Sequence, residues 1–294
     1  MQIQGGYALT IIANGLLIGA RDPLGIRPLV IGKFEDAYIL ASETCALDII
    51  GASFVREVEN GEVVIIRNGE IETRRPFPNN NKRPCVFEYI YFSRPDSILN
   101  GKTAYEYRKN LGIFLAKESD IKPDVIVPVP DSGVPAALGY SQETNIPFEL
   151  GLIRNHYVGR TFIEPTQQIR SLGVKLKLNP NLSSIKNKIV LLVDDSLVRG
   201  TTSFKIIKML YDSGAKEVHM RIASPQIKFP DFYGVDTPTQ AELLAANKNL
   251  EEMCEHIGAK SLNFLSINNL YKALGHNQRN EKNPQFTDHY FTGE

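Results

Sequence analysis

The chain has 294 residues, of which 43% are hydrophobic, and its 33 basic side chains balance 33 acidic ones. This composition predicts a globular protein of one large or two ordinary domains, and the neutral balance excludes the overall positive field typical of proteins that bind nucleic acid or anionic membranes. Any anion-binding site must therefore be local.

The three cysteines, Cys45, Cys85 and Cys254, lie far apart and form no CxxC pair. This spacing is typical of a reduced protein, so we expect a cytoplasmic location. The N-terminus lacks the charged region and long apolar run of a secretory signal, and no segment reaches the ~20 apolar residues that span a bilayer. We expect neither a membrane nor nucleic acid as a partner.

The first part of the chain is predicted to be antiparallel β-structure. Asn14–Gly15 separates YALTII from LLIGAR, and Asn68–Gly69 separates EVVII from EIETR. Asn-Gly pairs supply the positive φ angles that two-residue hairpins need. The stretch PFPNNNKRP at 76–84 follows, and its three prolines can continue neither a sheet nor a helix. We therefore end the first domain at residue 78, giving a domain of residues 1–78.

Strand and helix patterns alternate beyond this linker. DVIVPVP at 124–130 and KIVLLV at 188–193 are typical of buried strands, and helix-compatible stretches follow each of them. This alternation predicts an α/β domain with a mostly parallel sheet flanked by helices. We place it at residues 79–274 and treat residues 275–294 as a C-terminal tail.

Two helices of this domain carry clear signals. Thr103 and Glu106 have the spacing of a capping box at a helix start. The stretch SFKIIKMLYDSG at 203–214 has helical periodicity and ends at a glycine. The side chains predicted to face the core from this second helix are Phe204, Ile207, Leu210 and Tyr211.

The stretch VLLVDDSLVRGTTS at 190–203 joins a buried strand to that second helix. At the carboxyl edge of a parallel sheet, such a loop presents free backbone N–H groups, and Gly200 allows a ligand to approach the backbone closely. The hydroxyls of Thr201 and Thr202 add further donors. Together these groups suit a phosphate monoester.

The adjacent carboxylates of Asp194 and Asp195 need different partners, because they repel a phosphate. Sugar hydroxyls or a hydrated Mg²⁺ suit them. A ligand with a phosphate at one end, a diol in the middle and a metal-bound group at the other is phosphoribosyl pyrophosphate (PRPP). The common nucleotide motifs fit poorly, since the chain has no GxxxxGK[ST] and no GxGxxG followed by a distant acidic residue.

Several stretches resemble a known family. LLVDDSLVRGTT resembles the PRPP-binding signature of the type I phosphoribosyltransferases, and RNHYVGRTFIEPTQQIR, CVFEYIYFSRPDS and RDPLGIRPL are similar to stretches of the amidophosphoribosyltransferase family. The similarity runs from about Gly5 to about Leu274. It implies an α/β type I phosphoribosyltransferase fold, preceded by an antiparallel β-rich remnant of an N-terminal-nucleophile glutaminase domain.

The resemblance assigns PRPP binding to two loops. Their residues are Asp194, Asp195, Ser196, Leu197, Val198, Arg199, Gly200, Thr201 and Thr202 in the first loop, and Asp131, Ser132 and Gly133 in the second. Magnesium is assigned to Asp194, Asp195 and Ser132. Ser132 is chosen because many relatives have a hydroxyl residue where this chain has Gly133. Arg199 is expected to turn away from the phosphate or to screen charge.

The stretch at 154–170 resembles a loop that closes over bound PRPP. Its basic side chains suit a polyanion, and Tyr157 and Arg160 are the expected catalytic residues, with Thr161 and Gln168 as further candidates. A solvated surface loop is the alternative interpretation.

The implied activity is that of a pentosyltransferase. Ammonia displaces pyrophosphate from PRPP and gives 5-phosphoribosylamine, the first step of de novo purine biosynthesis. Relatives assemble as homo-oligomers and are inhibited by purine nucleotides, so we expect both here.

In relatives the ammonia comes from glutamine, which is hydrolysed by an N-terminal glutaminase domain. This chain begins MQIQGGYALT and matches only the closing part of that domain, so we expect no glutaminase half-reaction on this polypeptide. The ammonia would then be free or would come from a separate glutaminase chain. A fragment of a longer protein is the competing explanation.

Some relatives hold an iron–sulfur cluster through four cysteines. Cys85 matches the first ligand, but Asp231 occupies a later ligand position and the tail has no cysteine. A cluster needs several thiolates, so we expect none here.

Two other functions are compatible with a PRPP motif. One is a nucleobase phosphoribosyltransferase, against which the long similarity at 154–170 argues. The other is a non-catalytic PRPP-binding regulatory module. A helix-turn-helix or a similar nucleic-acid-binding motif would support that function, and we find no such pattern.

Overall fold

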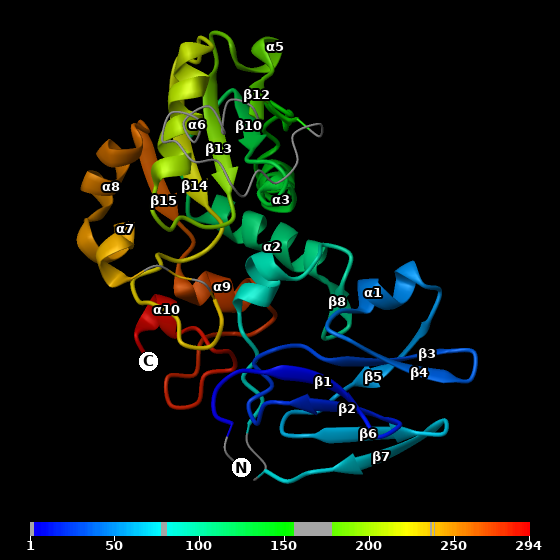
Figure 1. Cartoon of the computed structure of the whole chain (residues 1–294). Coiled ribbons are helices and arrows are strands. Elements are labelled where there is room, and N and C mark those ends of the chain that lie inside the picture. The colour runs from blue at the N-terminus through cyan, green and yellow to red at the C-terminus, as the bar shows by residue number, and fades with distance from the viewer. Residues whose placement is uncertain (1–2, 78–80, 156–177, 236, 238) are drawn as a thin grey trace, which may run out of the picture.

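The computed structural model describes residues 3–77, 81–155, 178–235, 237 and 239–294. The chain forms a β-rich N-terminal unit and an α/β unit (Figure 1). No helix among the described residues is long and apolar enough to cross a membrane.

Two antiparallel sheets make up the β-rich unit. The first has the order β1-β2-β6-β7, with β1 at Ala8–Ala13, β2 at Leu16–Arg21, β6 at Val63–Arg67 and β7 at Glu70–Arg74. The second has the order β4-β3-β5, with β4 at Ala37–Ala41, β3 at Val30–Phe34 and β5 at Ser53–Glu57. Both predicted hairpin turns are confirmed, since Asn14 and Asn68 have φ angles of 51° and 49°.

A short helix, α1 (Thr44–Ile49), covers the second sheet. Its Leu47 packs on Gly32 of β3, where an added Cβ would lie 2.4 Å from the Leu47 side chain. Glycine is therefore required at this position for the helix to lie this close to the strand.

The α/β unit is built on a parallel sheet, as predicted. Its order is β10-β13-β14-β15, with β10 at Val125–Pro128, β13 at Ile189–Asp194, β14 at Glu217–Ile222 and β15 at Ser261–Phe264. Successive residues of β13 alternate between two hydrophobic clusters: Leu191 and Val193 enter one, Val190 and Leu192 the other. The all-apolar strand pattern thus reflects a sheet that is buried on both faces.

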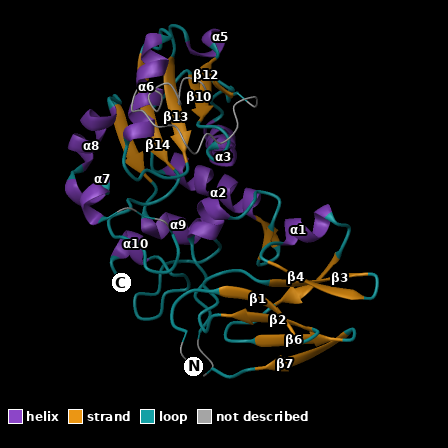
Figure 2. Ribbon diagram, in the orientation of Figure 1, coloured by secondary structure: helices purple, strands orange, loops and turns teal. Residues whose placement is uncertain are grey.

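Helices cover both faces of this sheet (Figure 2). One face is covered by α2 (Ala104–Lys117), α3 (Val134–Thr144) and α9 (Ile267–Ala273), and the other by α6 (Thr201–Asp212) and α8 (Leu250–Ile257). The capping box predicted for α2 is present, because the Glu106 amide donates to Thr103 Oγ1 at 3.2 Å and Glu106 Oε2 accepts from the Thr103 amide at 3.0 Å.

The predicted core face of α6 is partly wrong. Ile207 and Leu210 are buried, but Phe204 and Tyr211 are 46% and 37% exposed. Ile206 is buried in their place, because the arc of α6 that meets the sheet is centred nearer that residue.

Shorter elements complete the unit. They are the π-helix η1 (Glu88–Phe92), β8 (Ile98–Leu99), β9 (Lys102–Thr103), β11 (Leu152–Arg154), β12 (Leu178–Pro180), α5 (Leu182–Ile185), the 3₁₀-helix η2 (Gln240–Glu242), α7 (Leu244–Asn247) and α10 (His289–Thr292).

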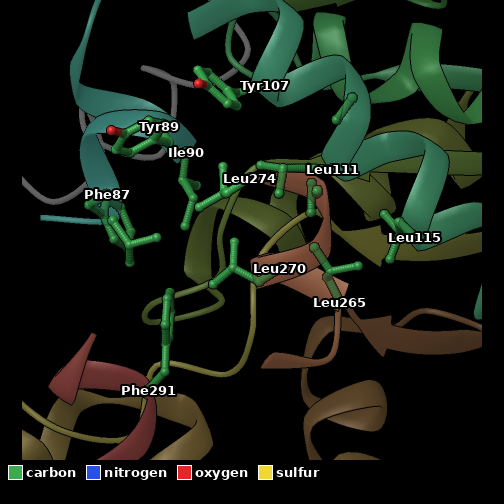
Figure 3. Close-up of a cluster of buried hydrophobic side chains, with 14 of the residues drawn as sticks. Phe87, Tyr89, Ile90, Tyr107, Leu111, Leu115, Leu265, Leu270, Leu274 and Phe291 are labelled. Atoms are coloured by element: carbon green, nitrogen blue, oxygen red, sulfur yellow. The ribbon is translucent and has the colours of Figure 1, made fainter. Parts of the chain in front are cut away.

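The larger hydrophobic cluster joins distant parts of the chain (Figure 3). Tyr89 of η1, Leu111 of α2, Leu270 of α9 and Phe291 of α10 all belong to it. Each such side chain contributes roughly 1.5–3 kcal/mol when fully buried. The C-terminal segment therefore packs into the core of the α/β unit.

Candidate functional site

Two adjacent carboxylates lie at the carboxyl end of β13. Asp194 is the last residue of the strand, and Asp195 is only 6% exposed. The Asp195 amide donates to Asp194 Oδ1 at 2.9 Å, and the Ser196 hydroxyl donates to Asp195 Oδ1. Burial, together with the neighbouring carboxylate of Asp195, holds the pKa of Asp194 well above its ordinary value, and burial raises the pKa of Asp195. A cation or hydroxyl donors would relieve this repulsion.

The loop that follows leads into the N-terminus of α6 through Gly200. This residue has a φ angle of 76°, and an added Cβ would lie 2.9 Å from the Leu244 side chain and 3.2 Å from that of Ile257. Among the described residues, no side chain caps the helix. Its first N–H groups are therefore available to an anion, as the sequence predicts.

Helix α7 supports this loop from behind. The Leu244 amide donates to the Val198 carbonyl at 2.9 Å. Arg199 forms an ion pair with Glu242 at 3.1 Å, so its guanidinium is engaged by a carboxylate of η2. The expectation that Arg199 turns away from a bound phosphate stays a prediction.

The second predicted loop connects β10 to α3 and lies beside the first. Ser132 Oγ is 3.5 Å from Asp194 Oδ1, which is at the limit of a hydrogen bond. A Cβ at Gly133 would lie 2.4 Å from the carbonyl oxygen of Val193, in the strand next to it. A side chain at position 133 would therefore clash with this backbone oxygen. The three predicted magnesium residues are therefore close together in the fold.

The outer residue of this second loop is engaged by a cation. Asp131 forms an ion pair with Arg154 at the end of β11. Strand β11 pairs with β12 in antiparallel fashion, so residues 154 and 178 lie opposite each other. The predicted catalytic residues Tyr157 and Arg160, with Thr161 and Gln168, lie outside the described residues.

The sequence-based predictions did not include one buried cation of α2. Arg108 is 5% exposed, and its guanidinium donates to the carbonyls of Tyr89 at 3.1 Å and Ser93 at 2.6 Å. The position of Arg108 within the apolar stripe formed by Tyr107, Leu111 and Leu115 could have indicated that its side chain is buried. A charged residue within such a stripe is rarely buried without a role.

The residues considered for a cluster have other partners. Cys85 Sγ lies 3.5 Å from the hydroxyl of Tyr290, and burial raises the pKa of the thiol to about 11. Asp231 pairs with His289 at 2.8 Å. Within the described ranges, no group of three or more His, Cys, Asp or Glu side chains is arranged to hold a metal.

A cavity of about 1130 Å³ is lined by the start of α9 and by the C-terminal segment. Its arginine, Arg279, is already paired with Asp288 and Glu294, both at 2.8 Å. The polar groups that need a ligand are instead those at the ends of β10 and β13, so we place the candidate site there.

Comparison with known proteins agrees with this location. The phosphoribosyl transferase domain family matches residues 97–223, which include both loops. The amidophosphoribosyltransferase of Rhizobium etli is 58% identical over 100% of this chain and 60% of its own length, and that of Bacillus subtilis is 50% identical over 93% of this chain and 57% of its own length. The chain thus spans about three fifths of these relatives.

Solved structures show the same similarity. The Bacillus subtilis glutamine PRPP amidotransferase, in complex with ADP and GMP, matches with a TM-score of 0.91 and 48% identity, over 99% of this chain and 64% of that one. The predicted type I phosphoribosyltransferase fold is therefore confirmed.

Proposed function

The chain is a homologue of the amidophosphoribosyltransferases, and on this premise we propose that it forms 5-phosphoribosylamine and pyrophosphate from PRPP and ammonia, the first step of de novo purine biosynthesis. The observation that carries the proposal is the acidic pair of Asp194 and Asp195 directly before the helix N-terminus at Gly200. One end of this site suits a phosphate and the other a diol or a metal.

The 5'-phosphate is bound by the loop from Ser196 to Thr202. Its backbone N–H groups and the exposed hydroxyls of Thr201 and Thr202 act as donors, and the positive end of the α6 dipole favours the dianion. Asp195 then accepts hydrogen bonds from the ribose hydroxyls.

Magnesium fits the donor set at the other end. Asp194, Asp195 and Ser132 would hold it together with oxygens of PRPP, since Mg²⁺ is commonly bound by one or two carboxylates plus substrate phosphates. When bound, the ion would neutralise charge on the departing pyrophosphate. Burial raises the pKa values of both aspartates, and the Asp195 carboxylate adds to this effect at Asp194, which supports a cation at this place.

The chemical step needs positioning and the exclusion of water. Neutral ammonia attacks the anomeric carbon as the bond to pyrophosphate breaks, and the new amine then loses a proton. The ribose is held between its phosphate and Asp195, and pyrophosphate lies against residues 131–133. Tyr157 and Arg160 would cover the reacting centre, where water competes with ammonia.

A glutaminase polypeptide is the proposed source of ammonia. Within the part of the chain that the structure describes, β1 is an edge strand, and its side chains Ile11 and Ile12, on opposite faces, are 46% and 85% exposed. An uncovered apolar strand edge of this kind favours association with further β-structure.

We propose that purine nucleotides inhibit this protein, because the solved structure of the Bacillus subtilis relative is a complex with ADP and GMP. A homo-oligomer in the cytoplasm remains our expectation.

The activity is tested by measuring pyrophosphate release from PRPP and Mg²⁺ with the purified chain. We expect release with ammonium salts and none with glutamine alone. Release that depends on a purine or pyrimidine base would instead support a nucleobase phosphoribosyltransferase. Binding of PRPP without any release would indicate a regulatory module.

A further inference from the structure

We propose that His219, Ser261 and Arg221 form a proton-sensitive bridge between β14 and β15, which is intact while His219 is neutral and breaks when His219 takes up a proton. The proposal is independent of the proposed function. It is carried by the hydrogen bonds of the three side chains, by the burial of Arg221 and by the order of donors and acceptors that these bonds require.

The three side chains lie on one face of the parallel sheet. His219 and Arg221 are two residues apart in β14, so they share a face, and Ser261 of β15 lies opposite His219 in the register of the two strands. The intervening residues of β14 enter the hydrophobic cluster on the other face, with α6 and α8: Val218, Met220 and Ile222. The polar group therefore lies on the side of α2 and α3.

The hydroxyl of Ser261 is the centre of this group. It accepts from Arg221 Nη1 at 3.0 Å and lies 2.7 Å from His219 Nδ1. The other ring nitrogen, His219 Nε2, lies 3.2 Å from Glu217 Oε2. Arg221 Nε donates to Ser119 Oγ at 3.0 Å. These contacts join β14 to β15 and to the segment that follows α2.

The order of donors indicates which nitrogen of His219 carries a proton. Arginine only donates hydrogen bonds, so the Ser261 oxygen is the acceptor for Arg221, and the Ser261 O–H is left to donate to His219 Nδ1. Nδ1 can accept this bond only when it has no proton. The proton of the neutral ring is then on Nε2, which donates to Glu217. A neutral His219 thus satisfies all of these groups.

Arg221 makes the protonated state of His219 unfavourable. Arg221 is 4% exposed, and its hydrogen-bond acceptors among the described residues are neutral hydroxyls and a carbonyl. A proton on His219 Nδ1 would bring a second cation to the Ser261 hydroxyl and would leave the Ser261 proton without its acceptor. Like charges repel strongly where water is excluded, and an unpaired buried donor is costly. Protonation therefore breaks the bridge.

The remaining charged groups do not reverse this effect. Glu217 attracts a protonated ring, but its side chain is 43% exposed and is screened by water. Lys260, directly before β15, repels it. Burial lowers the pKa of His219 below its ordinary value of 6.5, and the charges of Arg221 and Lys260 lower it further, against the opposing hydrogen bond to Glu217.

Other titratable groups face Arg221 and not the ring of His219. They come from the segment after α2, from α3 and from α8, and are Asp120, Tyr140 and Cys254. Burial lowers the pKa of Arg221, and these three groups act in the opposite direction. The cation beside the Ser261 hydroxyl therefore persists over the range in which a histidine titrates.

The direction of the pH dependence follows from the lowered pKa of His219. The folded chain binds this proton less tightly than the unfolded chain. The stabilising effect of the bridge is complete above pH 6.5 and is lost as pH falls from that value through the folded-state pKa.

Opening should be confined to the start of β15. Within the described ranges β15 is an edge strand, so β14 is its one neighbour in the sheet. Its other end is held by Glu118, whose carbonyl accepts from Asn263 Nδ2 at 3.2 Å and whose carboxylate accepts from the Ser266 amide at 2.9 Å. Loss of the bridge therefore exposes the amides near Ser261 first.

The test follows hydrogen exchange of the whole chain by mass spectrometry at about pH 7.5 and about pH 5.5. Protection of peptides from β15 is expressed relative to unstructured peptides, which removes the effect of pH on exchange itself. His219→Gln keeps an acceptor for Ser261 and a donor for Glu217 but takes up no proton. His256→Gln is the matched control, because His256 is an exposed histidine of α8.

We expect the protection of β15 in wild type to fall about threefold or more on acidification, with the same fall in His256→Gln and little change in His219→Gln. An equal fall in wild type and His219→Gln overturns the proposal. Nuclear magnetic resonance of the His219 ring gives a second measurement, and a ring with its proton on Nδ1 at the higher pH also overturns the proposal.

If His219→Gln does not fold, Ser261→Ala tests the same bridge. This variant removes the shared hydroxyl, so we expect about threefold weaker protection of β15 already at the higher pH. Wild-type protection in Ser261→Ala overturns the proposal, because the hydroxyl then does not hold the two strands together. None of these measurements depends on PRPP, so a failure here leaves the proposed function untouched.

Discussion

Gly112 of α2 and Gly139 of α3 each lie against the backbone of the other helix. A Cβ at Gly112 would be 1.8 Å from the Ala136 carbonyl oxygen, and a Cβ at Gly139 would be 1.9 Å from the Lys109 carbonyl oxygen. The two helices can approach this closely only because both residues lack a side chain. Helix α3 begins directly after the loop at Gly133, so this contact also positions the proposed pyrophosphate site.

Replacing Gly112 by alanine should separate the two helices and destabilise the α/β unit. Alanine favours helix formation by ~1 kcal/mol relative to glycine, but the clash with a backbone carbonyl outweighs this gain, and we expect a net loss of about 3 kcal/mol. The melting temperature should fall by roughly 6–10 °C. Gln142→Ala, at an exposed position of α3, is the control and should change it little. A Gly112→Ala protein as stable as wild type would contradict the close packing.

Gly200→Ala should weaken PRPP binding. Both a positive φ angle and contacts with Leu244 and Ile257 oppose a side chain there, so the phosphate loop must shift. We expect the dissociation constant of PRPP to rise about tenfold or more, measured by titration calorimetry with Mg²⁺.

Gly258→Ala is the matched control, because Gly258 has a φ angle of 72° and no heavy atom within 4 Å of an added Cβ. The control should lose roughly 1 kcal/mol of stability and keep its PRPP affinity. Equal affinities in the two variants would show that the position of the loop does not matter for binding.

Local signals explain which features the sequence could predict. The hairpin at Asn14–Gly15, the capping box of Thr103 and Glu106 and the acidic pair with its phosphate loop each depend on residues within a few positions of one another. Their geometry follows from backbone preferences and side-chain chemistry. The fold class followed because alternating strands and helices have few alternatives.

Features made by distant residues could not be predicted in this way. The requirement for glycine at 133 comes from the Val193 carbonyl, which only sheet pairing brings near. The exposure of Phe204 depends on how α6 is rotated against the sheet. The burial of Arg108 was missed because its partners, the carbonyls of Tyr89 and Ser93, are brought near it only by the packing of η1 against α2.

Asp194→Asn should raise stability while removing activity. The pKa of Asp194 lies above its ordinary value of 3.8, so the folded chain binds this proton more tightly than the unfolded chain. Stability therefore falls as pH rises from that value through the folded-state pKa, and the ionised pair destabilises the fold at pH 7. Thermal unfolding should show a higher melting temperature for the variant at pH 7 and no difference near pH 3.8.

The same Asp194→Asn protein should release pyrophosphate about 100-fold more slowly, because it lacks a proposed magnesium ligand. Full activity of the variant would show that Asp194 is not part of the active site. A variant that is less stable at pH 7 would show that the carboxylate is compensated in the free protein.

Asp231→Asn should detach the C-terminal segment from the loop at 231–235. The Asp231 carboxylate is fully buried, accepts from the amides of Tyr233 at 2.9 Å and Val235 at 2.6 Å, and pairs with His289 at 2.8 Å. Burial raises its pKa, but the hydrogen bond from His289 and the two amides outweigh burial and leave the pKa below 3.8. The pair therefore stabilises the fold above that value, and this stability is lost as pH falls through the folded-state pKa.

Asn cannot replace the buried carboxylate as the acceptor for His289 and the two amides without leaving polar groups unsatisfied, at a cost of about 2–3 kcal/mol, so the Asp231→Asn protein should melt at a clearly lower temperature at pH 7, with the difference shrinking below pH 3.8. Hydrogen exchange should show faster opening of the helix at His289–Thr292 than in wild type.

Asp212→Asn is the matched control. Asp212 pairs with Lys208 at 3.1 Å, and both side chains are more than half exposed. Exposed pairs of this kind contribute at most about 1 kcal/mol to stability. If both variants lose the same small amount of stability, the Asp231–His289 pair does not hold the C-terminal segment in place.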